Sequence, residues 1–151
     1  RFIERAFDSP EAAAASIEAI LDSDLCPMVL DLYRLNGNQL TLVIGFAGTG
    51  DEVKWQLEQA AALGFTSGTT LDYNCQFFTQ TPGAAVRSVL PSKLTEVIST
   101  VHGSFVARAG NGVIYHAGPA YKAPLRSLAI MERLKNCFDP KQTLPPLPFQ
   151  Q

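Results

Sequence analysis

The chain has little charge, few histidines and no long apolar run. Only 17% of its 151 residues are charged, which leaves room for a face that is buried against a partner. No apolar stretch approaches the roughly 20 residues that a membrane-spanning helix needs. The N-terminus also lacks the basic region followed by an apolar core that marks a secretory signal. We therefore expect a cytoplasmic protein that does not insert into a membrane.

The cysteines are too few and too scattered to build a framework. There are three of them, Cys26, Cys75 and Cys137. Their spacing of about 50 or 60 residues predicts neither a set of disulfides nor a clustered metal site. Free thiols in a reducing compartment are the simpler interpretation.

The net charge of −2 conceals two halves of opposite sign. Residues 1–83 contain four Lys or Arg against eleven Asp or Glu, and residues 84–151 contain eight against three. Either the second half meets an anionic partner, or the two halves neutralise each other within one fold. The basic residues are dispersed and do not alternate with aromatic residues, so nucleic acid is not an expected partner.

The periodicity of apolar residues predicts a mixture of helices and hairpins. The residues before Ser9 look helix-like. Ser9 and Pro10 are expected to begin a helix that ends before Pro27. Further along the chain, Trp55 is expected to lie in the core or in a contact between lobes. The expected elements after the first helix are the strands 28–35 and 39–46, a helix that ends at Gly64, a surface loop over 66–83, a strand over 84–90, a short helix that reaches Val101, a hairpin over 105–118, a helix that ends before Asp139 and an extended tail over 143–151.

This order of elements predicts an α+β domain. Helices would pack on one face of a mainly antiparallel sheet, in a ferredoxin-like or duplicated ferredoxin-like arrangement. Such an architecture does not by itself name a function.

A glycine-rich loop precedes the second helix and invites comparison with phosphate-binding loops. Gly45, Gly48 and Gly50 are in the order GxxGxG, and no Gly-Lys-Ser/Thr follows them. Asp51 and Glu52 would lie where a phosphate should bind, and they would repel it. The pattern therefore predicts a helix capped by its own residues.

The densest group of polar residues lies in the stretch FVARAGNGVIYHAG, residues 105–118. Two strands flank a turn made by Gly110, Asn111 and Gly112. Glycine has no Cβ, so such a turn can bring backbone N–H groups close to a ligand or cofactor.

Three side chains of this region, and one from the strand expected over 84–90, are candidates for chemistry. Arg108 suits bidentate binding of a substrate carboxylate, with an exposed strand residue as the alternative, and Arg87 is a second candidate for that carboxylate. His116 is a candidate proton acceptor, with a strand-end histidine bonded to backbone as the alternative. Tyr115 is a candidate for stacking or hydrogen bonding near a ring, with a half-buried strand tyrosine as the alternative.

Three stretches of the second half carry a resemblance to a known family. They are VRSVLPSKLTEVI (86–98), FVARAGNGVIYH (105–116) and LKNCFDPKQTLPP (134–146). In order and spacing they resemble the C-terminal cap domain of FAD-linked oxidases of the vanillyl-alcohol oxidase type, most of all the flavoprotein subunits of glycolate oxidase. The early stretch SPEAAAASIEAILDSDLCPMVLDL (9–32) resembles the first helix and strand of that domain.

The resemblance implies that the hairpin lies over a flavin ring, but the chain departs from the family pattern. Family members that act on hydroxy acids have a His-x-Gly-Asp-Gly-Asn-x-His pattern here, and this chain keeps only the glycines. Arg108, Asn111, Val113 and Tyr115 replace the first His, the Asp, the Asn and the second His. Metal binding loses its ligands with these changes. The family's Leu-Asn-Pro-Gly tail is replaced by the residues from Leu144 to Leu147.

From the resemblance we expect residues 1–142 to be the substrate-side cap domain of a larger FAD-dependent oxidoreductase, with 143–151 as a proline-rich tail. The substrate would be a small 2-hydroxy acid such as glycolate, and the parent would be an accessory subunit or a member with different substrate chemistry. FAD would be held mainly by a domain that precedes this chain, so the chain alone is expected to be colourless and inactive. The expected partners are that domain of the same parent and other oxidase subunits. The alternative is a free-standing ferredoxin-like module that binds a small ligand or mediates assembly without catalysis.

Overall fold

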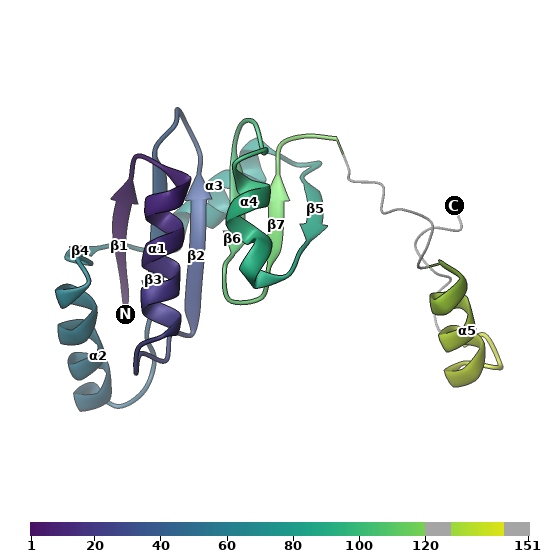
Figure 1. The fold of residues 1–151 in the computed structure, drawn as a ribbon, viewed down its shortest axis with the longest axis horizontal. Coiled ribbons are helices and arrows are strands. Elements are labelled where there is room, and N and C mark those ends of the chain that lie inside the picture. The colour runs from purple at the N-terminus through teal and green to yellow at the C-terminus, as the bar shows by residue number, and fades with distance from the viewer. Residues whose placement is uncertain (120–127, 144–151) are drawn as a thin grey trace. The chain divides into compact units, whose positions relative to one another are not determined.

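The computed structural model describes residues 1–119 and 128–143. The chain divides into two units, residues 1–121 and 122–151, and the first contains a single sheet with its helices (Figure 1). The described part of the second contains the helix α5 (Leu128–Phe138). Among the described residues, no helix is both long and apolar enough to cross a membrane.

The first unit contains seven strands, four α-helices and one 3-10 turn among the described residues. They are β1 (Phe2–Phe7), α1 (Pro10–Leu21), β2 (Val29–Arg34), β3 (Leu40–Gly45), α2 (Gly50–Ala62), β4 (Ser67–Gly68), α3 (Asp72–Gln80), β5 (Ala85–Ser88), a 3-10 turn (Pro91–Lys93), α4 (Leu94–Ile98), β6 (Phe105–Arg108) and β7 (Val113–His116).

The strands form one antiparallel sheet in the order β4-β1-β3-β2-β6-β7-β5. This confirms the predicted α+β class with a mainly antiparallel sheet. The order β1-α1-β2-β3-α2-β4 is the β-α-β-β-α-β sequence of elements found in ferredoxin-like motifs. The order β5-α4-β6-β7 repeats the first four of these elements, and pairing of β2 with β6 joins the two repeats.

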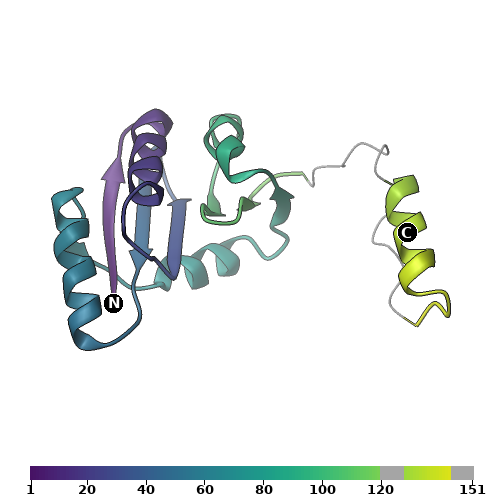
Figure 2. The same cartoon turned by 60° about the horizontal axis from the view of Figure 1, so that its bottom comes forward.

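The main core lies between the sheet and the helices α1, α2 and α4. Ser9 caps α1 by accepting a hydrogen bond from the backbone N–H of Ala12 at 3.2 Å, as the sequence predicts. Ile17 and Ile20 of α1 are buried, and they belong to one apolar cluster with strand residues such as Leu42. Figure 2 shows α1 and α4 on one side of the sheet and α3 on the other.

The helix α3 was not expected. The segment 66–83 was predicted to be a surface loop because polar residues dominate it, but it contains β4 and α3. Tyr73 and Phe77 lie one turn apart on α3 and are buried against Val43 and Val106 on the opposite face of the sheet. The expectation that helices cover one face therefore holds for α1, α2 and α4 but not for α3.

The first residues also differ from expectation. They were predicted to be helix-like, but they form β1, which pairs with β3 on one side and β4 on the other. Ile3 and Phe7 face the main core, whereas Phe2 packs on the face that α3 covers. Alternating burial of this kind is the pattern of a strand, and the pairing with β3 is what selects it.

Candidate functional site

A tight turn joins β6 to β7 and positions the predicted site residues. The backbone N–H of Gly112 donates to the carbonyl oxygen of Arg108 at 2.9 Å, and that of Asn111 donates to the same oxygen at 3.2 Å. The side-chain oxygen of Asn111 accepts from the N–H of Val113 at 3.2 Å. The turn is thus closed by its own hydrogen bonds.

The sheet separates the predicted side chains into two groups. Successive residues of a strand face opposite sides. Tyr115 pairs with Val106 and lies on the face that α3 covers, and Arg108 lies on this face too. His116 follows Tyr115 and therefore faces the side of α1 and α4, as does Arg87, which pairs with the core residue Ile114. The structure does not bring the four side chains into one site.

Arg108 is engaged inside the domain. It forms an ion pair with Asp31 of β2, and its Nη2 donates to the side-chain oxygen of Asn74 on α3 at 3.0 Å. The side chain of Asp31 is 3% exposed and that of Arg108 is 28% exposed. The hydroxyl of Tyr73 donates to the same oxygen of Asp31 at 2.5 Å. Four residues from β2, β6 and α3 therefore form one polar cluster, which we call the Asp31 cluster.

A second tyrosine, Tyr33, extends this cluster along the sheet face. The rings of Tyr33 and Tyr73 stack with their centroids 4.4 Å apart and their planes 3° from parallel. Burial raises the pKa of both hydroxyls, and the negative charge of Glu4 raises the pKa of Tyr33 further, as Asp31 does for Tyr73. Neither phenol ionises at physiological pH. Glu4 Oε2 is buried and has no hydrogen-bond partner among the described residues.

A hollow of about 380 Å³ opens beside the ion pair and is the candidate functional site. Its lining includes the predicted residues Arg108, Gly110 and Asn111 together with Asp31 and Met28. A Cβ added at Gly110 would meet no atom within 4 Å, so the backbone is open to approach from outside the domain. The lining offers a guanidinium, an amide and an accessible backbone, which suit a carboxylate or carbonyl, but it offers no histidine or cysteine as proton acceptor or nucleophile.

Gly112 and Tyr115, which were also predicted as site residues, make contacts that serve the fold. Gly112 has φ +74°, and a Cβ there would overlap the backbone carbonyl of Val89. This glycine is required by the fold whether or not a ligand is present. The ring of Tyr115 meets that of Phe78 edge to face at a centroid distance of 5.2 Å.

The sequence interpretation missed Asp31, Tyr73 and Asn74 as site residues. Asp31 lies on the same face of β2 as Tyr33, opposite Leu30, and an acid among apolar strand residues is a signal for a buried partner. Tyr73 and Asn74 fall in the segment that was predicted to be a loop, so no signal in the sequence pointed to them.

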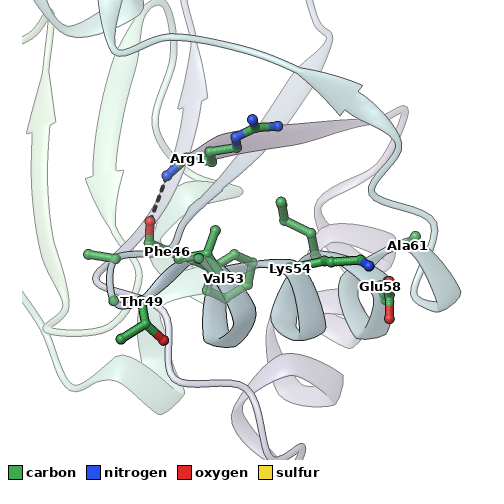
Figure 3. A pocket seen from close by; sticks show the side chains of 11 residues that line it. Arg1, Phe46, Thr49, Val53, Lys54, Glu58 and Ala61 are labelled. Carbon is green, nitrogen blue, oxygen red and sulfur yellow. Dashed lines mark hydrogen bonds between the residues drawn. The ribbon is translucent and has the colours of Figure 1, made fainter.

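A second hollow, of about 810 Å³, lies beside α2 (Figure 3). Its lining includes the apolar Phe46 and Val53 and the charged Arg1 and Lys54, and the amine of Arg1 donates to the carbonyl oxygen of Phe46 at 2.6 Å. Thr49, which caps the start of α2, also lines this hollow.

The start of α2 is capped by side chains, as the sequence predicts. Thr49 Oγ1 accepts from the N–H of Glu52, and the N–H of Thr49 donates to Glu52 Oε2 at 2.8 Å, which completes a capping box. The carboxylate therefore lies where a phosphate would have to bind, and the glycine-rich loop is not a phosphate site.

This box predicts a pH-dependent effect on stability. Hydrogen bonds from Thr49 lower the pKa of Glu52 below its ordinary value of 4.5. Because the folded-state pKa is depressed, the stabilisation is complete above the ordinary pKa and is lost as pH falls through the folded value. We expect Glu52→Gln to unfold at lower urea concentration than the original chain at neutral pH and at the same concentration in acid.

Thr49→Ala should lower the free energy of unfolding by about 1 kcal/mol. Asp8→Asn, an exposed acid outside the helices, serves as the control for general charge effects. A difference between Glu52→Gln and the original chain that does not change with pH would contradict the assignment.

Among the described residues, no group of three His, Cys, Asp or Glu could hold a metal ion. Comparison of the chain with protein-family models, with curated proteins and with solved structures found no match.

Proposed function

We propose that this chain is the C-terminal, substrate-side cap domain of an FAD-dependent oxidoreductase that acts on a small 2-hydroxy acid such as glycolate. The sequence resemblance of residues 86–98, 105–116 and 134–146 motivates the proposal. The structural observation that carries it is that the domain does not need a glycine at position 110. The φ angle of Gly110 is not in the left-handed region, and a Cβ added there would enter open space.

A glycine without an internal reason favours close approach by something outside the domain, and a flat ring requires such an approach. Arg108 and Asn111 flank Gly110 in the same hollow. The guanidinium has five N–H donors, and its bonds to Asp31 and Asn74 use only part of them, so Arg108 keeps donors for a substrate carboxylate. These groups would orient the hydroxy acid from the side of this domain.

FAD, when bound in the parent protein, supplies the acceptor for the hydride. The domain's own contribution is orientation and charge. His116 lies on the opposite face of the sheet from Arg108, so it would not reach a substrate held by Arg108 as a proton acceptor. We expect that group to come from the flavin-binding domain.

The experiment uses the complete reading frame that encodes this chain. We expect the purified parent to show flavin absorbance and to reduce a dye when glycolate or a related 2-hydroxy acid is added. Gly110→Ala should lower kcat/KM at least about tenfold, which corresponds to about 1.4 kcal/mol of transition-state stabilisation.

Gly83→Ala is the matched control, because a Cβ at Gly83 would also meet no atom within 4 Å and Gly83 lies outside the hollow. It should leave kcat/KM unchanged. A parent without flavin, or tight stoichiometric binding of FAD by the chain 1–151 alone, would contradict the proposal.

One observation favours a second candidate, a free-standing module without catalysis. Arg108 already has partners in Asp31 and Asn74, so the polar cluster is complete without a ligand. In that case the reading frame would encode no flavin-binding domain, and Gly110→Ala would have no effect on any oxidase activity of the host.

A further inference from the structure

Trp55 is the only tryptophan of the chain, and it does not lie in the core, which was one of the two places expected for it. It lies on α2 with 45% of its surface exposed. Two hollows adjoin it, of about 620 and 290 Å³, and Trp55 and Asp24 line both. We call the region formed by Trp55, Met28, Asp22, Asp24 and Asp51 the Trp55 surface.

The centre of the Trp55 surface is apolar and its charged groups have one sign. Met28 is 74% exposed and lines the larger hollow with Trp55. Asp51 lines the same hollow, and Asp22 lines the smaller one. Neither lining includes a lysine or arginine, and the three aspartates form no ion pair among the described residues.

The backbone under this surface is held in place before any partner binds. Gln56, the neighbour of Trp55 on α2, is buried and accepts a hydrogen bond from the N–H of Cys26 at 3.0 Å. The N–H of Met28 donates to the carbonyl of Gly45 at 2.8 Å. The loop that carries Asp22, Asp24 and Met28 is thus tied both to α2 and to the sheet, so binding would require little ordering.

We propose that the Trp55 surface docks a protein segment that presents arginine or lysine beside apolar side chains. Exposed tryptophan and methionine are typical of the centre of protein interfaces, where tryptophan is often among the residues that contribute most binding energy. A guanidinium stacks on the face of an indole ring and forms bidentate bonds to carboxylates. Unpaired aspartates around Trp55 therefore favour a basic partner over an acidic or neutral one. The proposal does not depend on the flavoenzyme function.

The test uses the fluorescence of Trp55, which has no other tryptophan to obscure it. The chain 1–151 is titrated with a synthetic helical peptide of alternating leucine and arginine blocks, and separately with the same peptide carrying glutamate in place of arginine. We expect the basic peptide to shift the emission to shorter wavelength with saturation, more weakly as salt rises, because the indole becomes covered and the attraction is screened. The acidic peptide should produce no shift.

Two double variants show whether the aspartates are responsible for binding the basic peptide. Asp22→Asn together with Asp24→Asn should weaken binding of the basic peptide at least tenfold. Within residues 1–119 and 128–143, neither side chain forms a hydrogen bond or ion pair that the fold would lose. Asp8→Asn with Glu18→Gln removes the same charge elsewhere and should weaken it less than twofold.

Three results would overturn the proposal. They are equal binding of the acidic peptide, equal loss in both double variants, and an emission shift that follows protein concentration without peptide. The last would identify a second copy of the chain as the occupant.

Discussion

Replacing Asp31 by asparagine is expected to lower the free energy of unfolding by about 3 kcal/mol, the low end of the cost of breaking a buried ion pair. Asp31 Oδ2 accepts from both Arg108 and Tyr73, and its side chain is 3% exposed. Asparagine keeps the shape but leaves the guanidinium without a counter-charge. The expected loss is at the low end because the side chain of Arg108 is 28% exposed and water screens part of its charge. Urea unfolding of the chain 1–151 measures it as a shift in midpoint at constant m-value.

Further variants separate the contribution of the Asp31–Arg108 ion pair to the free energy of unfolding from that of the rest of the Asp31 cluster. Tyr73→Phe removes one hydrogen bond to a charged group and should cost about 1.5–3 kcal/mol. Arg108→Gln should couple to Asp31→Asn, so the double variant should lose less than the two single losses combined. The exposed Asp8→Asn is the control. A loss below about 0.5 kcal/mol for Asp31→Asn, which is typical of surface positions, would show that the pair does not stabilise the fold.

The position of this ion pair explains why its effect should be large. Asp31 and Arg108 are direct neighbours in the register of β2 and β6, the two strands through which the repeats meet. Tyr73 and Asn74 bring α3 onto the same junction. The Asp31 cluster therefore connects the two repeats and holds α3 against the sheet through hydrogen bonds.

The elements that the sequence predicted are those with local signals. The start of α1 has Ser9 and Pro10, and the start of α2 has acids in its first turn, so neighbours in sequence supply the caps. The turn between β6 and β7 was recognisable from Gly110 and Gly112. Each signal spans fewer than ten residues.

The helix α3 and the ion pair of Arg108, which were missed, depend on partners far away in the sequence. Tyr73 of α3 bonds to a residue 42 positions earlier, and Arg108 pairs with one 77 positions earlier. Polar composition alone made α3 look like a loop, because burial of Tyr73 and Phe77 appears only once the sheet exists. Tertiary contacts overrode local propensity there.

The separation of the predicted site over two faces was accessible from the sequence. Tyr115 and His116 are consecutive in a strand, so they cannot both point into one site. The sequence could not show whether Tyr115 or His116 lies on the same face of the sheet as Asp31, the partner of Arg108. That depends on the register between β2, β6 and β7.

The second large effect is expected at Gly112. Gly112→Ala should lower the free energy of unfolding by about 3 kcal/mol or more, because left-handed backbone costs an alanine about 1–3 kcal/mol and steric overlap adds to it. The overlap would be with the backbone of Val89, which cannot rotate away as a side chain can. The N–H of Val89 also donates to the carbonyl of Gly112 at 2.9 Å, so relief of the overlap would strain this bond.

Gly110→Ala is the matched control two residues away. It has no left-handed φ and no atom within 4 Å of the added Cβ. Fewer conformations in the unfolded chain should make it neutral or more stable by about 0.4–1 kcal/mol. Urea midpoints of the two variants, measured side by side on the chain 1–151, test both expectations. Equal destabilisation would contradict the difference that the geometry predicts.

The two glycines therefore separate folding from function within one turn. A loss of activity in Gly112→Ala would say nothing about a ligand, because the fold requires that glycine by itself. A loss of activity in Gly110→Ala with stability retained would have no cause inside the domain. It would have to arise from whatever approaches the hollow formed with Arg108 and Asn111. The proposal that a flavin approaches this turn is therefore tested by Gly110→Ala, even though Gly112→Ala is expected to have the larger effect on stability.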